Sequence, residues 1–174
     1  MLTTVDAMLE RIVMMLERLI YNIIKLTNLF KKSNTDVSKT DHGVTYTDNR
    51  DGTYTVSTSG SSSATTECSL GPSITFKQHH VYYIGGAPAG SGLSTYYLYF
   101  HLGSGLVDTG GGTVKNMGSY ATSSFVPKIK TDINVSIPTS VVFRPAVYDL
   151  TEFFGAGKEP KTVEEFMAYA HEGE

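Results

Sequence analysis

A heptad repeat of apolar residues at the amino-terminal end most constrains how this 174-residue chain can fold. The apolar residues recur at alternating spacings of three and four, and no Gly or Pro interrupts them. This pattern predicts a coiled-coil helix over residues 1–33, with a length of roughly 45 Å for about 30 helical residues. The stripe consists of Leu2, Val5, Leu9, Ile12, Leu16, Leu19, Ile23, Leu26 and Phe30.

Such a helix needs a partner, because an isolated amphipathic helix has nothing against which to bury its apolar stripe. Several positions beside the stripe are also apolar, among them Met8, Val13, Met15 and Ile20. Apolar flanking positions widen the stripe, and Leu and Ile at the two core positions of the heptad favour more than two helices. We therefore expect a homo-oligomer, with a trimer favoured. Docking on a different protein and association with a membrane surface remain alternatives.

The same segment predicts neither a signal peptide nor a membrane span. Charged residues interrupt its apolar run, so that no window approaches the ~18 consecutive apolar residues that a spanning helix needs. These residues are Asp6, Glu10, Arg11, Glu17 and Arg18.

The centre of the chain predicts an antiparallel β-sandwich of the jelly-roll type over residues 42–148, after a polar linker at 34–41. Gly43–Thr47 and Thr53–Ser57 flank a loop that ends in Asp-Gly, which is a hairpin signal. Glycine-rich turn segments separate further short runs of β-branched and aromatic residues. Strands are expected at Ser73–Lys77, His80–Ile84, Thr95–Leu102, Thr113–Met117, Ser123–Val126, Asp132–Ile137 and Val141–Val147.

Strand Thr95–Leu102 suggests a ligand-binding face. Its alternation places Tyr96, Leu98, Phe100 and Leu102 on one face, the better candidate for the core, and Thr95, Tyr97, Tyr99 and His101 on the other. Exposed Tyr rings beside Gly-rich loops can stack on sugar rings and donate hydrogen bonds to them. The alternative is that these rings pack under a neighbouring loop or subunit. The expected ligand contacts are Tyr97, Tyr99 and Tyr82.

Chemical motifs for catalysis or cofactor binding are nearly absent. Neighbouring residues of a strand point to opposite faces, so His79 and His80 would not converge on one metal ion. Cys68 has no local setting of a nucleophile and is expected to be a packed thiol. The net charge of −3 does not favour a nucleic-acid surface. We therefore expect no enzyme, no cofactor, no metal and no nucleic-acid partner.

The carboxy-terminal residues 149–174 predict two short helices. Asp149 is suited to cap the first helix, and Gly155 and Gly157 are suited to end it. Thr162 and Glu165 have the spacing of a capping box for the second helix.

This ending resembles a recurrent ending of β-sandwich modules in virion proteins of tailed bacteriophages. The match covers about 25 residues from Val142, through the sequence DLTEFFGAGKEPKTVEEF, and departs from the common pattern at Lys158, where Asn is commoner. The segment Gly43–Val56 also resembles the opening of such modules. The resemblance implies a carbohydrate-binding-like jelly roll, of the kind found in tail fibres, baseplate components, receptor-binding proteins and head fibres.

Together, the heptads and the resemblance predict a non-enzymatic phage structural protein in the virion, made in the bacterial cytoplasm. We expect a homotrimeric, fibre-like appendage that contributes to adhesion on a host-surface glycan. Its amino-terminal helix would be held by a capsid, portal, tail or baseplate protein. The alternative is a purely structural head-fibre, decoration or baseplate component without a ligand of its own.

Overall fold

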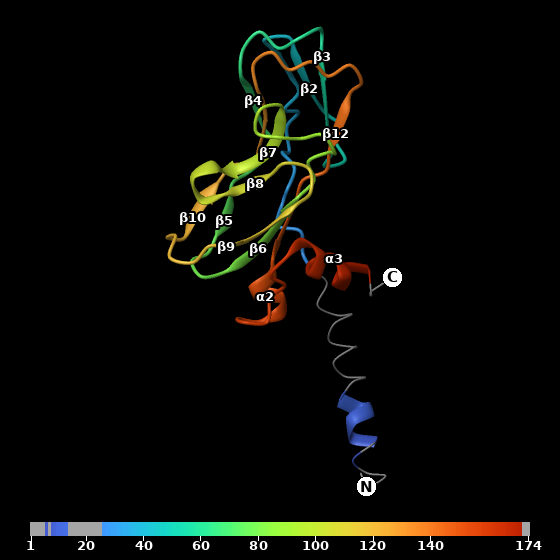
Figure 1. Ribbon diagram of the computed structural model, residues 1–174, viewed down its shortest axis with the longest axis vertical. Helices are drawn as coiled ribbons and strands as arrows, with labels where there is room; N and C mark the ends of the chain where they lie inside the picture. Colours follow the sequence, from blue (N-terminus) through green and yellow to red (C-terminus); the bar gives the residue numbers. More distant parts are fainter. Residues whose placement is uncertain (1–5, 7, 14–25, 172–174) are drawn as a thin grey trace.

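The computed structural model describes residue 6, residues 8–13 and residues 26–171. The described chain is mainly β and its sheets are antiparallel, as expected for a β-sandwich (Figure 1). The strands are β1 (Lys39–Asp41), β2 (Val44–Asp48), β3 (Tyr54–Thr58), β4 (Thr66–Ser69), β5 (Ile74–Phe76), β6 (Val81–Gly85), β7 (Tyr96–His101), β8 (Leu106–Asp108), β9 (Thr113–Asn116), β10 (Ser123–Phe125), β11 (Lys128–Thr131), β12 (Val141–Phe143) and β13 (Ala146–Asp149). The helices are the 3₁₀ turn η1 (Leu102–Ser104), α2 (Leu150–Phe154) and α3 (Val163–His171).

The four sheets pack face to face around one core. The sheet β1-β2-β3-β12 faces β4-β11-β7-β8, and the sheet β13-β6-β9 faces β10-β5. Side chains join the facing sheets: the Phe143 and Tyr96 rings meet edge to face with centroids 6.1 Å apart, and those of Phe76 and Tyr82 lie 4.9 Å apart. The Tyr46 hydroxyl donates a 3.0 Å hydrogen bond to Thr131 across the same interface.

Pro145 and Asn134 interrupt segments that the sequence predicts as continuous strands. The expected strand Val141–Val147 is two strands, β12 and β13, because Pro145 cannot donate a ladder hydrogen bond between them. The expected strand Asp132–Ile137 is wrong: the segment makes an isolated bridge between Ser136 and Ser61 and two backbone hydrogen bonds to Ser62, and Asn134 has a positive φ of 63°. Strands β1, β4, β8 and β11 were not expected, and β1 lies in the predicted linker 34–41.

Buried tyrosines in the core make the head sensitive to alkali. Burial raises the pKa of Tyr46 and of Tyr54 to about 12, from an ordinary value of 10.0. The neutral phenol is therefore favoured in the folded state, and this contribution is fully present below pH 10 and is lost as the pH rises through 12. We expect the urea concentration at the midpoint of unfolding to decrease as the pH rises from 10 to 12. The midpoint of Tyr46→Phe should decrease less steeply with pH. Equal dependence on pH in both proteins would contradict the assignment.

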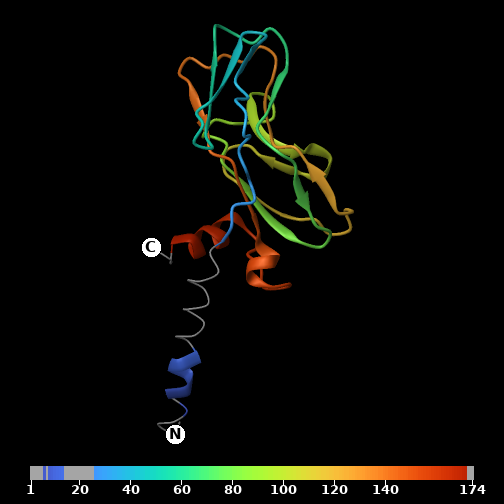
Figure 2. The same cartoon turned by 180° about the vertical axis from the view of Figure 1, so that it is seen from behind.

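The amino-terminal segment is helical in residues 8–13 but not in residues 26–33, which we call the strap. The strap runs in extended form along the side of the head, from the carboxy-terminal helices toward β1 (Figure 2). The Leu29 amide donates to the Val147 carbonyl (2.8 Å), and the Ser33 amide donates to that of Leu70 (3.2 Å). The Asn28 side chain accepts from the Val147 amide (2.9 Å) and donates to the Pro145 carbonyl (3.3 Å).

The expected helix over residues 1–33 is therefore wrong for its last eight residues. Phe30 is buried in the head, edge to face with Tyr54 at a centroid distance of 6.2 Å, and Leu26 packs against the cluster that holds Phe166. Both residues bury their apolar side chains against the head of their own chain instead of a neighbouring helix. Leu9 and Ile12 lie in the helical residues, and the other stripe positions, Leu2, Val5, Leu16, Leu19 and Ile23, lie outside the described residues.

The carboxy-terminal helices begin at the cap residues that their sequence predicts, but the capping box of α3 is only half formed, because Glu165 accepts from the Lys161 amide instead of that of Thr162. Asp149 accepts a 3.0 Å hydrogen bond from the Glu152 amide at the start of α2, and Gly155 follows the helix with a φ of 86°. Thr162 accepts from the Glu165 amide at the start of α3 (3.1 Å). Phe166 on α3 stacks on Tyr83 of β6 with centroids 4.5 Å apart, which fixes α3 beside the head.

Candidate functional site

The three tyrosines expected as ligand contacts are all buried. Tyr82 has no exposed surface and lies in the core, where its hydroxyl accepts a 2.8 Å hydrogen bond from the Lys77 amide. Tyr82 is therefore wrong as a contact residue in this conformation. The reason is its position in β6, where it belongs to the inward-facing set and packs against Phe76 of the facing sheet.

Tyr97 and Tyr99 face away from the core, as the alternation of β7 predicts, but they are covered. Their exposed fractions are 2% and 9%. The ammonium groups of Lys130 and Lys128, on the neighbouring strand β11, lie 5.6 and 5.9 Å from the two ring centroids. The Tyr99 hydroxyl donates a 2.5 Å hydrogen bond to Glu67 on β4. These cross-strand partners occupy the surface that an incoming sugar would need.

The end of β7 departs from the expected alternation. A register shift lies between Tyr99 and His101 where β7 pairs with β8, and η1 follows directly. Leu102, expected in the core, is consequently 46% exposed. Tyr120 is also 46% exposed, and its hydroxyl donates a 3.1 Å hydrogen bond to the Gly103 carbonyl. An exposed tyrosine thus exists on the head, but at a position that strand alternation could not indicate.

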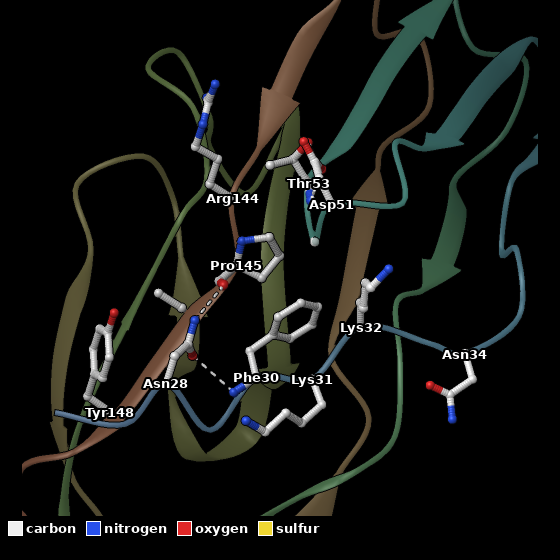
Figure 3. Close-up of a pocket in the computed structure, with 12 residues that line it drawn as sticks. Asn28, Phe30, Lys31, Lys32, Asn34, Asp51, Thr53, Arg144, Pro145 and Tyr148 are labelled. Carbon is white, nitrogen blue, oxygen red and sulfur yellow. Dashed lines mark hydrogen bonds between the residues drawn. The ribbon is translucent and has the colours of Figure 1, made fainter. Parts of the chain in front are cut away.

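An open hollow of about 700 Å³ lies between the strap and the junction of β12 with β13. We call it the strap groove. Phe30 and Pro145 lie at its centre, and Asn28 holds the strap to Pro145 (Figure 3). Its lining residues are Asn28, Phe30, Lys31, Lys32, Asn34, Asp51, Gly52, Thr53, Arg144, Pro145, Ala146 and Tyr148.

The rim of the strap groove is basic. Lys31, Lys32 and Arg144 contribute three exposed cations, and Asp51 contributes the one carboxylate. In Figure 3, Arg144 and Lys32 extend toward the top of the view with Asp51 between them, and Lys31 extends toward the lower left. Hydrogen bonds from Thr53, more than any other influence, hold the pKa of Asp51 below its ordinary value, so this carboxyl is ionised at neutral pH.

The helical residues 8–13 form an exposed apolar surface. Met8, Leu9, Ile12 and Val13 are 65%, 60%, 45% and 45% exposed, and their spacing places them along one side of a helix. An apolar helix face of this kind costs free energy in water until it is covered. Figure 1 shows these residues lying apart from the β head.

The described residues show no side-chain arrangement typical of a catalytic or metal site. No group of three or more His, Cys, Asp or Glu side chains suited to a metal ion occurs among them. His80 binds Asp149 (2.9 Å), and His79 lies in a turn with a φ of 64°. Burial raises the pKa of the Cys68 thiol to about 11, which suppresses the thiolate. Among these residues, no helix is long and apolar enough to cross a membrane.

Comparison with models of protein families, with curated proteins and with solved structures found no match to this chain.

Proposed function

We propose that the protein is a non-enzymatic structural protein of a phage virion, a homotrimeric fibre-like appendage that contributes to adhesion on host-surface glycans. The observation that carries this proposal is a helix with an exposed apolar face, attached to a closed β head through a strap that is itself part of the head's core. The helix would form the shared stalk, and the heads would be jelly rolls carried around it.

Three further features support the proposal. The heptad spacing in the sequence favours three helices, and the closing DLTEFFGAGKEPKTVEEF segment resembles the ending of phage β-sandwich modules. The strap anchors each head next to its stalk, so three heads would present three copies of one surface. A repetitive glycan then engages several weak sites at once, which raises the overall affinity without any new contact.

Ile12→Asp tests the stalk. The unaltered protein should be a trimer by light scattering, and Ile12→Asp should be a monomer with a folded head, because it buries three charges in the helix seam. Arg11→Asp is the matched control: it places the same side chain on the neighbouring position, outside the stripe, and should stay trimeric. A monomeric unaltered protein would remove the stalk from the proposal.

The same samples test adhesion. Labelled trimer should bind the surface of susceptible strains in a bacterial panel at least ten times more tightly than the Ile12→Asp monomer, because the monomer has lost avidity.

The burial of Tyr82, Tyr97 and Tyr99 favours a second function, a structural component without its own ligand. A stable trimer that binds no strain in the panel would support that second function.

A further inference from the structure

We propose that the strap groove binds an anionic saccharide chain, one whose sugars carry carboxylate or phosphate groups. This inference rests on the proposed function, since it names the chemical class of the surface glycan and the part of the head that receives it.

The charges of the residues that line the strap groove do not balance. Three cations and one carboxylate line the strap groove, although the whole chain has a net charge of −3. Among the described residues, the side chains of Lys31 and Arg144 have neither an ion-pair partner nor a hydrogen-bond partner. Two other cations of the head have partners: Lys77 binds Glu152 (2.7 Å) and Lys128 binds Glu67 (3.1 Å). Two unpaired cations that line one groove are suited to an anion from outside.

The Asp51 carboxylate, which is the anion that lines the strap groove, already has hydrogen-bond donors within its own loop. Asp51 Oδ1 accepts hydrogen bonds from both the amide and the hydroxyl of Thr53, at 2.8 and 2.7 Å. The Lys32 ammonium donates to the Arg50 carbonyl, which holds this cation at the rim without neutralising it. The charge of Arg144 helps to lower the pKa of Asp51, but its guanidinium donates no hydrogen bond to that carboxylate. Its planar set of donors therefore stays available to a carboxylate or a phosphate, which it matches with two parallel hydrogen bonds.

The shape of the surface around the strap suits a polymer better than a small anion. A second open hollow, of about 500 Å³, lies on the strap as well, and both hollows are lined by Lys31, Lys32 and Asn34. An extended polymer could cross the strap and occupy both hollows, whereas a single small anion would fill only a part of one. Tyr148 also lines the larger hollow, and its half-buried ring lies beside the rings of Tyr83 and Phe166. The part of this ring that stays exposed can pack on the apolar face of a sugar.

Calorimetric titration of the trimer with three polymers of matched length tests the inference. The probes are polygalacturonate as the carboxylate chain, polyglycerol phosphate as the phosphate chain and dextran as the neutral chain. We expect one or both anionic chains to bind, and dextran not to bind. Affinity should fall at least threefold when salt rises from 50 to 200 mM, because added ions screen exposed charges.

Two charge-removing variants locate the site. Lys31→Gln combined with Arg144→Gln should lower the affinity at least tenfold, whereas Lys158→Gln combined with Lys161→Gln, which removes two exposed cations near α3, should leave it unchanged. Both pairs should melt like the unaltered protein. Equal losses in the two pairs, absence of binding to either anionic chain, or equal binding of single-stranded DNA of the same charge would overturn the inference. A trimer that binds bacterial strains but neither anionic chain would overturn only this inference and leave the proposed function standing.

Discussion

Replacement of Phe30 by Ala is expected to lower the free energy of unfolding of the head by about 3–5 kcal/mol, the usual cost of deleting a buried aromatic ring. Phe30 is 7% exposed and meets the ring of Tyr54, whose hydroxyl donates to the Leu70 carbonyl at 2.7 Å. The cavity would also loosen the strap, since Leu29 and Ser33 bind the head on either side of Phe30. Urea denaturation followed by near-ultraviolet circular dichroism of the tyrosines measures the loss.

Leu9→Ala is the matched control, because Leu9 occupies the same heptad stripe but is 60% exposed. It should weaken association and leave unfolding of the head within about 0.5 kcal/mol of the unaltered protein. Both variants are compared at one protein concentration, since association adds to the apparent stability. If Phe30→Ala altered only the oligomeric state, Phe30 would belong to the stalk and the strap assignment would be wrong.

Asp108→Ala is the second change with a large expected effect. Asp108 has no exposed surface, and its carboxylate accepts four backbone hydrogen bonds. One oxygen accepts from the Ala87 amide (2.7 Å), and the other accepts from the amides of Gly110, Gly111 and Gly112 (2.8–3.2 Å). Removing the carboxylate leaves these donors without their acceptor, at an expected cost of at least about 3 kcal/mol.

Asp108→Asn separates the two sides of this contact. The amide oxygen can still accept from the three glycines, but the amide nitrogen would face the Ala87 N–H, so we expect a loss of about half that of Asp108→Ala. Thermal and urea unfolding of both variants provides the comparison. A loss below about 1 kcal/mol for Asp108→Ala would mean that water replaces the carboxylate and that the two loops do not depend on it.

Local chemistry was sufficient to predict several elements. The hairpin of β2 and β3 is signalled by alternation around an Asp-Gly turn, and α2 and α3 by their capping residues. Strand β11 escaped prediction because Lys128–Thr131 contains a single apolar residue and reads as a polar stretch. The segment after it alternates well in sequence, but the positive φ of Asn134 turns the chain before a strand can form.

Long-range packing accounts for what the sequence could not indicate. A heptad pattern specifies that Leu26 and Phe30 are buried, but not whether a neighbouring helix or the head of the same chain buries them. Alternation placed Tyr97 and Tyr99 on the outer face, but their cover comes from Lys128 and Lys130 on another strand. The strap groove joins Lys31 to Arg144, 113 positions later, and no spacing rule connects them.

The strap also determines how the protein responds to tension. A pull on the amino-terminal end reaches the head at residues 26–33, before it can load any strand of the sandwich. The hydrogen bonds of Asn28 and Leu29 to β13 and the ring of Phe30 then resist together. At Gly71 a Cβ atom would stand 2.3 Å from the Lys31 carbonyl oxygen, so the strap lies in direct backbone contact with the head there. We expect detachment of the strap to lengthen the chain between the amino-terminal helix and the sheets before any strand pairing in the sheets is broken.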